Sequence, residues 1–232
     1  MYSLYSRLLL TLIISSSVIA APALSQTRLM IVDQNNAPLS NAVIEYSRAS
    51  ILEPTDITQN DDKVYIMDQV NKQFEPHVLI IPEDSLVSFP NSDDIRHHVY
   101  SFSEPKVFEL KLYAGKPKKP IRFNQSGLVV MGCNIHDSMV GYIYVSSHDN
   151  TYMSNEQGEI LLPHTLPANT QVNVWHPESA TGVSKHVNFL ISQSMLDKSE
   201  NENENENEVV LKVSVNPPAT RDSFEELDIN EY

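Results

Sequence analysis

The sequence predicts an all-β protein. Three observations lead to this fold class. No long window shows apolar residues at a sustained helical period, short apolar or alternating runs recur along the chain, and Pro, Asn, Asp and Gly separate these runs. About 207 residues remain after a leader of 25 residues, which is enough for one large β-domain or two small ones.

The first 25 residues have the pattern of an export signal. Met1–Arg7 carries one positive charge, Leu8–Ala20 is apolar, and Ala23-Leu-Ser25 fits a cleavage site of small residues, although a cut after Ala20 is an alternative. The apolar run is too short to favour a membrane span, and an uncleaved anchor is the minor interpretation. We expect a periplasmic or secreted protein with no stable membrane insertion of the mature chain.

Runs with the composition of β-strands follow in order. They are Thr27–Val32, Ala42–Tyr46, His77–Ile81, Leu86–Phe89, His98–Phe102, Val107–Leu112, Ile121–Phe123, Leu128–Met131, Gly141–Val145, Ile160–Leu162, Gln171–Trp175 and Val209–Val215. Turn-rich or loop-like segments separate several of them: Asp33–Ser40, Ser50–Asp62, the basic Ala114–Pro120, and Asn155–Glu159. From Glu200 to Glu208 glutamate and asparagine alternate, and such a polar tract cannot bury a core, so we expect disorder there and in the acidic tail.

These features divide the chain into five parts. They are a signal peptide (1–25), N-terminal β-strands (26–63), a β-core (64–147), a β-rich appendage (148–198) and an acidic low-complexity segment with its tail (199–232). The appendage is expected to form a small sandwich of its own or to add strands to the main one.

The charge balance limits the partners. The formal net charge is −14, and removal of residues 1–25 leaves 15 basic and 30 acidic residues. Nucleic acid is excluded as a partner, because its phosphates would be repelled. The acidity is typical of an ordinary acidic secreted protein, and it is also compatible with steering of a basic partner.

The single cysteine carries the strongest chemical signal. Cys133 has no partner for a disulfide in this chain, and an odd cysteine in an exported protein indicates an intermolecular bridge, a reactive thiol or a metal ligand. His136 and Met139 follow it at steps of three residues, and the pair His97-His98 lies upstream. Thiolate, two imidazoles and a weak thioether form the ligand set of blue-copper electron-transfer sites.

Other interpretations of these residues remain open at this point. Cys133, His136 and Met139 are also compatible with a packing stripe on one helical face, and His97 with a hydrogen-bonded core or surface histidine. Zinc also accepts cysteine and histidine, but methionine is a poor zinc ligand. A nucleophilic cysteine with a histidine base is a third interpretation, which no further acyl-transfer signal supports.

Two motifs resemble the cupredoxin superfamily. Val87, Phe89, Asn91 and Asp93, followed by His97-His98-Val99, are similar to the segment that ends in His-Asn-Val in plastocyanin-like proteins, and Cys133-x2-His136-x2-Met139 has the spacing of amicyanin. The resemblance implies a Greek-key β-sandwich with flanking β-strands, and one mononuclear type 1 copper held by His97, Cys133, His136 and Met139. Asn91, His98 and Asn134 are then expected to support the ligands. Gly132 stands where many cupredoxins have an aromatic residue.

A closer resemblance, over roughly Thr27 to Pro177, is to exported cupredoxin-like proteins called methylamine utilisation proteins. It is carried by the segments Asp68–His77, Phe89–Ser103, Leu112–Gly115, Gly132–Asp137 and Val174–Pro177. Ser138 departs from that family, which often has a bulky aromatic residue there. His77 and His176 recur in it, and we interpret them first as hydrogen-bonded structural residues and second as a further metal or docking site.

The resemblance implies a one-electron carrier rather than an enzyme. Its partner would be a redox protein, with electrons exchanged at the exposed edge of His136. Two other functions are kept as alternatives: copper storage or delivery, and a metal-free interaction module. The absence of a Met-rich or His-rich tract disfavours the former, and the intact four-ligand set disfavours the latter.

Overall fold

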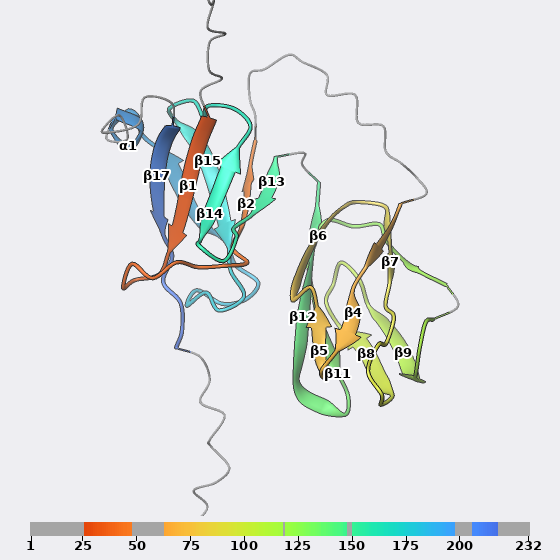
Figure 1. Cartoon of the computed structure of the whole chain (residues 1–232). Coiled ribbons are helices and arrows are strands. Elements are labelled where there is room, and N and C mark those ends of the chain that lie inside the picture. Colours follow the sequence, from red (N-terminus) through yellow and green to blue (C-terminus); the bar gives the residue numbers. More distant parts are fainter. Residues whose placement is uncertain (1–25, 48–62, 118, 148–149, 198–205, 218–232) are drawn as a thin grey trace, which may run out of the picture.

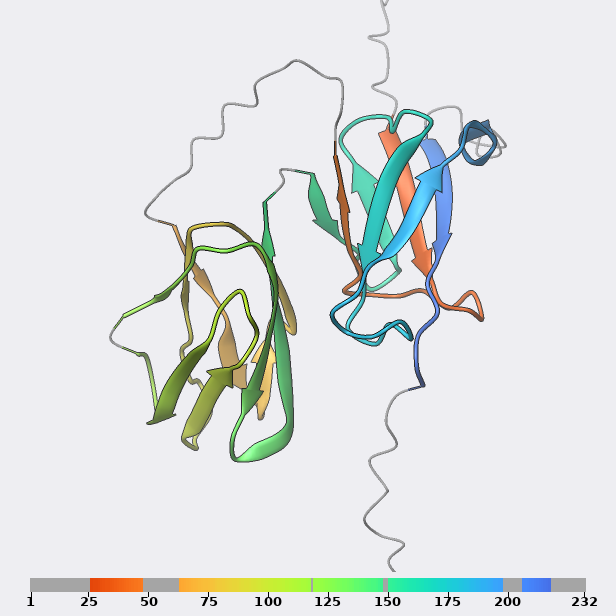
Figure 2. The same cartoon turned by 180° about the vertical axis from the view of Figure 1, so that it is seen from behind.

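The computed structural model describes residues 26–47, 63–117, 119–147, 150–197 and 206–217. The expected signal peptide, the loop Ser50–Asp62 and the last residues of the acidic tail lie outside this part of the chain. The described residues form two β-rich lobes that lie side by side (Figures 1 and 2). We call residues 63–117 and 119–147 the first lobe, and residues 26–47, 150–197 and 206–217 the second lobe.

The first lobe is a β-sandwich. Its larger sheet has the strand order β6-β12-β11-β8-β9, and its smaller sheet the order β10-β7-β3. A short hairpin, β4-β5, accompanies them. The strands are β3 (Val64–Ile66), β4 (Asp68–Val70), β5 (Gln73–Glu75), β6 (Val78–Pro82), β7 (Ser85–Ser88), β8 (His97–Ser101), β9 (Phe108–Tyr113), β10 (Ile121–Phe123), β11 (Gly127–Cys133) and β12 (His136–Ser146).

The second lobe combines segments from both ends of the chain. One sheet has the order β14-β1-β17 and the other β13-β2-β15-β16. The elements are β1 (Gln26–Val32), β2 (Val43–Tyr46), β13 (Thr151–Met153), β14 (Glu159–Leu162), β15 (Thr170–Trp175), β16 (Val187–Ile191), the short helix α1 (Gln193–Asp197) and β17 (Glu206–Lys212). β17 pairs with β1 in parallel along its whole length.

Each lobe has its own hydrophobic core, because alternate residues of each strand point to opposite faces. In the first lobe Val87 and Phe123 of the small sheet pack with Val99, Met131 and Ile143 of the large one. The second core contains residues of both sheets, namely Leu29, Ile31, Ile44, Val172, Val174, Ile160, Leu162, Val209 and Leu211. This arrangement confirms the prediction of an all-β sandwich protein with additional strands.

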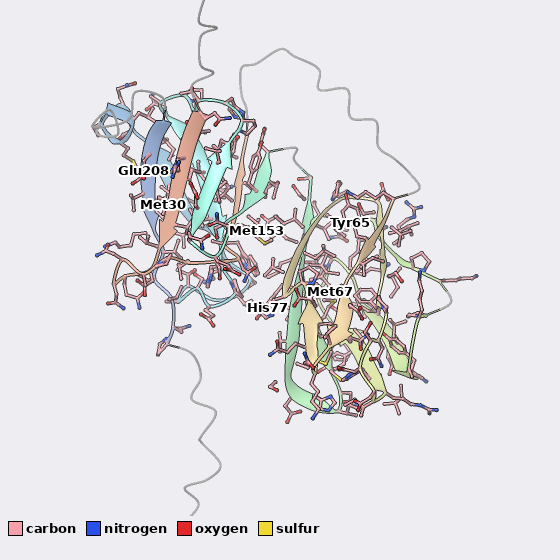
Figure 3. All side chains as sticks on the ribbon, viewed as in Figure 1. Met30, Tyr65, Met67, His77, Met153 and Glu208 are labelled. Carbon is pink, nitrogen blue, oxygen red and sulfur yellow. The ribbon has the colours of Figure 1, made fainter. Side chains whose placement is uncertain are left out.

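A third cluster joins the lobes. Trp175 is fully buried, and its ring contacts Tyr142 and Tyr144 of β12 with centroid distances of 5.4 and 6.0 Å. The Tyr144 hydroxyl donates to Glu45 at 2.6 Å and lies 2.8 Å from Nε2 of His186, so residues of the second lobe hold β12 by polar contacts as well. In Figure 3, Met153 of the second lobe and His77 of the first lie on the facing sides.

The expected strands are present, with shifted ends at several of them. β12 begins at His136 rather than Gly141, so the segment between the expected strands Leu128–Met131 and Gly141–Val145 is mostly strand. The tract Glu200–Glu208 was expected to be disordered along its length, but its residues 206–208 belong to β17, because pairing with β1 supplies partners that composition does not reveal. The sequence did not indicate β3, β4, β5, β13, β16 and α1. Among the described residues, no helix has the length and apolar character needed to cross a membrane.

Candidate metal centre

Three side chains that can bind a metal meet at one end of the first lobe. The Cys133 sulfur lies 3.5 Å from Nδ1 of His97 and 3.8 Å from Nδ1 of His136, and the three ligand atoms lie within 4.8 Å of one another. His97 and Cys133 are buried, and His136 is half-buried. The chain therefore presents one sulfur and two nitrogens to a common point, with limited access from solvent.

Neighbouring strand ends produce this arrangement. His97 is the first residue of β8, Cys133 the last of β11, and His136 the first of β12. β11 lies between the other two strands in the sheet, and Asn134 and Ile135 form the tight turn after the cysteine. Cys133, His136 and Met139 thus belong to a β-hairpin, and the interpretation of a stripe on a helical face is wrong.

A break in strand register allows Met139 to be buried. Gly132 pairs with Val140, whereas Cys133 pairs with His136, so the register shifts between Gly132 and Cys133. Asp137, Ser138 and Met139 are therefore extra residues of β12 that have no paired residue in β11. Met139 is 1% exposed and belongs to the same buried cluster as Cys133. The extra residues of β12 therefore bury the Met139 side chain in the core that also contains Cys133, while Asp137 and Ser138 face solvent.

The orientation of His97 is fixed by a carboxylate. Its Nε2 donates to Oδ2 of Asp93 at 2.7 Å, which leaves the lone pair of Nδ1 directed at Cys133. Asp93 also accepts from the backbone N–H of Asn71 at 2.5 Å and of Lys72 at 2.9 Å. Burial by itself raises the pKa of Asp93, but the hydrogen bonds from Lys72, His97 and Asn71 lower it below its ordinary value. A histidine held in this way is typical of metal sites.

Asn91 holds the loop that carries Asp93. Its amide donates to the carbonyls of Ile95 and Tyr113, both at 2.9 Å, and its oxygen accepts from the backbone N–H of Asp93 at 3.1 Å. The Tyr113 hydroxyl donates to the Phe89 carbonyl at 2.8 Å, and burial raises the pKa of this hydroxyl to about 12. Asn91 thus supports the segment before His97 rather than the metal itself.

The neighbouring residues His98 and Asn134 lie outside the cluster. The His98 ring points to the opposite face of β8, where its Nε2 lies 2.9 Å from Oε1 of Glu109. The two residues are joined by backbone, since the N–H of Asn134 donates to the His98 carbonyl at 3.0 Å. His98 therefore holds the turn after Cys133 through its main chain and not through its ring.

Tyr100 fills the space beside Gly132. A Cβ placed on Gly132 would lie 2.9 Å from the Tyr100 hydroxyl oxygen and 3.0 Å from the adjoining ring carbon. The two residues pair directly across β8 and β11. An aromatic ring thus covers the residue before the cysteine, but it comes from the neighbouring strand rather than from position 132.

Sequence reasoning missed Asp93 and Tyr100 as parts of this site. Asp93 is present in the Val-x-Phe-x-Asn-x-Asp motif, but its spacing from His97 predicts no contact without the loop geometry. Gly132 was the indirect signal for Tyr100, since a glycine in a strand indicates the close approach of another group.

His77 and His176 lie outside the metal centre. The His77 ring lies edge-on to the Tyr142 ring, and His176 donates to the Ser40 carbonyl at 3.1 Å.

The donor set fits copper. Soft thiolate and thioether sulfurs with imidazole nitrogens suit copper better than magnesium, calcium or manganese, which prefer oxygen. The burial of Cys133 and Met139 gives the low-polarity surroundings that tune such sites. Among the described residues, His97, Cys133 and His136 are the one group of His, Cys, Asp or Glu residues close enough to hold a metal ion together.

Comparison with known proteins finds similarity at the level of solved structures. No protein-family model matches the sequence, and no curated protein matches it. A purple cupredoxin from Nitrosopumilus maritimus is 24% identical over 37% of this chain and 100% of its own, with a TM-score of 0.32. An amicyanin variant is 19% identical over 36% of this chain and 82% of its own, with a TM-score of 0.32.

A copper-containing nitrite reductase from Thermus scotoductus SA-01 is 25% identical over 51% of this chain and 28% of its own, with a TM-score of 0.34. These matches cover between 36% and 51% of this chain.

Proposed function

We propose that the protein binds one copper ion through His97, Cys133, His136 and Met139 and carries single electrons as a cupredoxin of the type 1 class. The observation that carries this proposal is the convergence of one sulfur and two imidazole nitrogens within 4.8 Å. Bound copper would supply a one-electron redox couple. Copper storage or delivery is the alternative that the chelator experiment below separates from electron transfer.

Each of the four proposed ligands would have a different role at the copper site. Cys133 would hold the ion through its sulfur and His97 and His136 through imidazole nitrogens, while Met139 would provide a weak fourth contact. The strand ends and the Asp93 carboxylate hold these donors in one arrangement, which limits reorganisation between oxidation states. His136 is the most exposed of the four donors, and we propose that electrons enter and leave at its edge.

Burial of the donors favours an electron carrier over a copper delivery protein. His97, Cys133 and Met139 are 0%, 3% and 1% exposed, so release of the ion would require the hairpin to open. The export signal predicted in residues 1–25 would place the protein in the periplasm or outside the cell, where its redox partner would also lie.

The visible spectrum of the copper-loaded full chain tests the proposal. With Cys133 shown to be a free thiol before loading, an intense thiolate-to-copper band and its loss in Cys133→Ser are expected. A copper-loaded protein without such a band would overturn the type 1 assignment. Slow release of copper to a chelator would separate a carrier from a delivery protein.

Two buried methionines provide a matched comparison for the axial ligand. Met139 and Met131 are both 1% exposed in the same cluster. Met139→Leu should raise the reduction potential, because a weak donor is lost, whereas Met131→Leu should leave the potential unchanged. Equal potentials for the two variants would remove Met139 from the site.

A further inference from the structure

The large sheet of the first lobe has an outer face that is covered at one end only. Trp175 packs on Tyr142 and Tyr144, which belong to β12 and lie next to β6. The strands β8 and β9 form the opposite edge of this sheet, on the side away from the second lobe (Figures 1 and 2). The inter-lobe interface thus continues into a sheet surface that nothing in the described chain covers.

Apolar side chains are exposed on this edge. Phe102 is 80% exposed, Val107 64% and Leu112 48%. The Phe102 ring rests on Tyr100 at a centroid distance of 5.1 Å. Scattered apolar residues are common on protein surfaces, but aromatic and aliphatic side chains gathered on one hairpin are typical of an interaction site.

A bulge places one of these side chains on the surface. His97 pairs with Tyr113 and Val99 with Leu110, so Lys111 and Leu112 both oppose the single residue His98. Such an extra residue changes the direction of a side chain in the bulged strand. Because it occurs beside His97, it brings Lys111 and the exposed Leu112 close to the metal end of the sheet.

The hairpin together with the loop that follows it is positively charged on an acidic protein, since residues 97–119 contain five lysines and two glutamates. Residues 63–147 contain 9 basic and 9 acidic residues, so the remaining 7 basic and 21 acidic residues account for the whole net charge of −14. Five of the 9 basic residues are the lysines between positions 106 and 119. Of the two acidic residues in this stretch, Glu104 is exposed in the turn, and Glu109 is paired with His98 at 2.9 Å.

This surface is also close to the candidate metal centre through the chain. The Tyr100 ring contacts Gly132, whose peptide bond leads directly to Cys133. A molecule seated on Tyr100 and Phe102 would therefore be separated from the cysteine by one aromatic ring and one residue.

We propose that the outer face of the β8–β9 hairpin, with Tyr100, Phe102, Val107, Leu112, Lys106 and Lys111, is a docking surface for an acidic redox-partner protein. The inference rests on the proposed electron-carrier function. The lysines would steer the partner, since complementary charge speeds and orients association. The apolar side chains would then supply the contact area. The surface would act in addition to the edge of His136.

The location of the surface can be mapped with hexacyanochromate(III), a paramagnetic anion that is inert to redox chemistry. The full chain loaded with Cu(I), or free of metal, is observed by amide NMR at low ionic strength. We expect the broadened signals to centre on residues 98–113. Lys106→Glu with Lys111→Glu should abolish the effect, and the matched pair Lys185→Glu with Lys212→Glu, at exposed positions of the second lobe, should retain it.

The rate of oxidation of the Cu(I) protein by hexacyanoferrate(III) provides the second measurement. The Lys106/Lys111 double variant should react about tenfold more slowly at low salt, and the Lys185/Lys212 control less than about twofold more slowly. The visible copper band should be equal in the unmodified protein and in both double variants. Absence of this band in the unmodified protein would contradict the proposed copper site. Broadening away from residues 98–113 would contradict the docking surface alone.

Two results would overturn the docking proposal. One is broadening that centres on the residues around His136, or that persists in the Lys106/Lys111 variant. The other is a dimer in sedimentation experiments that this variant dissociates, because a second copy of the acidic chain would then be the occupant.

Discussion

The contact between Asp93 and His97 leads to a sharp prediction for metal affinity. Replacement of Asp93 by alanine removes the acceptor of the His97 Nε2–H, which is 2.7 Å away and belongs to a fully buried ring. Asn71 and Lys72, which donate to the same carboxylate, are exposed and can bond to water instead. The main cost is therefore the unsatisfied imidazole N–H, about 1–3 kcal/mol.

This cost agrees with the effect expected on binding. Loss of a partner that orients a metal ligand typically lowers metal affinity by about 10- to 100-fold. A 100-fold loss corresponds to about 2.7 kcal/mol, which is within the range estimated for the unsatisfied donor. We therefore expect Asp93→Ala to weaken Cu(I) binding by about 10- to 100-fold at constant pH.

Competition with a Cu(I) chelator measures the affinity, and Asp94→Ala is the matched control. Asp94 is the next residue in the chain and is exposed, so its replacement changes the net charge equally without removing the contact to His97. Asp93→Asn, which keeps one acceptor oxygen, should fall between the two. An affinity of Asp93→Ala within about twofold of that of Asp94→Ala would refute the role given to this carboxylate.

Three further predictions follow from other contacts. His97→Ala should abolish the visible copper band, whereas His98→Ala should keep it, because the His98 ring pairs with Glu109 on the other face; the reverse result would make His98 the ligand. Gly132→Ala should lower the free energy of unfolding by about 1–3 kcal/mol through the clash with Tyr100, as measured in urea, and an equal loss in a Tyr100→Ala background would contradict this reason. Burial lowers the pKa of His176, so the unfolded chain binds more protons below pH of about 6.5 and stability should fall on acidification through that range. His176→Gln should reduce this slope, and an unchanged slope would assign the pH dependence to other groups.

Much of the local structure could be predicted from the sequence. Strands such as β1, β10 and β14 follow from alternating or apolar runs bounded by turn residues. The short strands β4 and β5 could not be predicted in this way. Asn71 and Lys72 between them have left-handed φ values of 53° and 59°, a turn that allows a tight hairpin but gives little signal in the sequence.

The types of ligand are set by the sequence, and their meeting is set by the fold. Cys133, His136 and Met139 are close in the chain, so their spacing alone indicates a shared site. His97 is 36 residues away from Cys133 and reaches it because β8 pairs with β11. Asp93 and Tyr100 acquire their roles through contacts that depend on this pairing, and a local pattern contains no information on them.

The assembly of the second lobe was decided by the tertiary structure alone. β1 lies between β14 and β17, strands that follow it by more than a hundred residues, and Trp175 packs against a strand of the other lobe. The sequence determined which segments would be extended and which side chains could bind copper, because backbone preference and ligand chemistry are properties of single residues and short runs. Strand partners and side-chain neighbours depend instead on complementary surfaces brought together from distant segments, and only the folded chain brings those surfaces into contact.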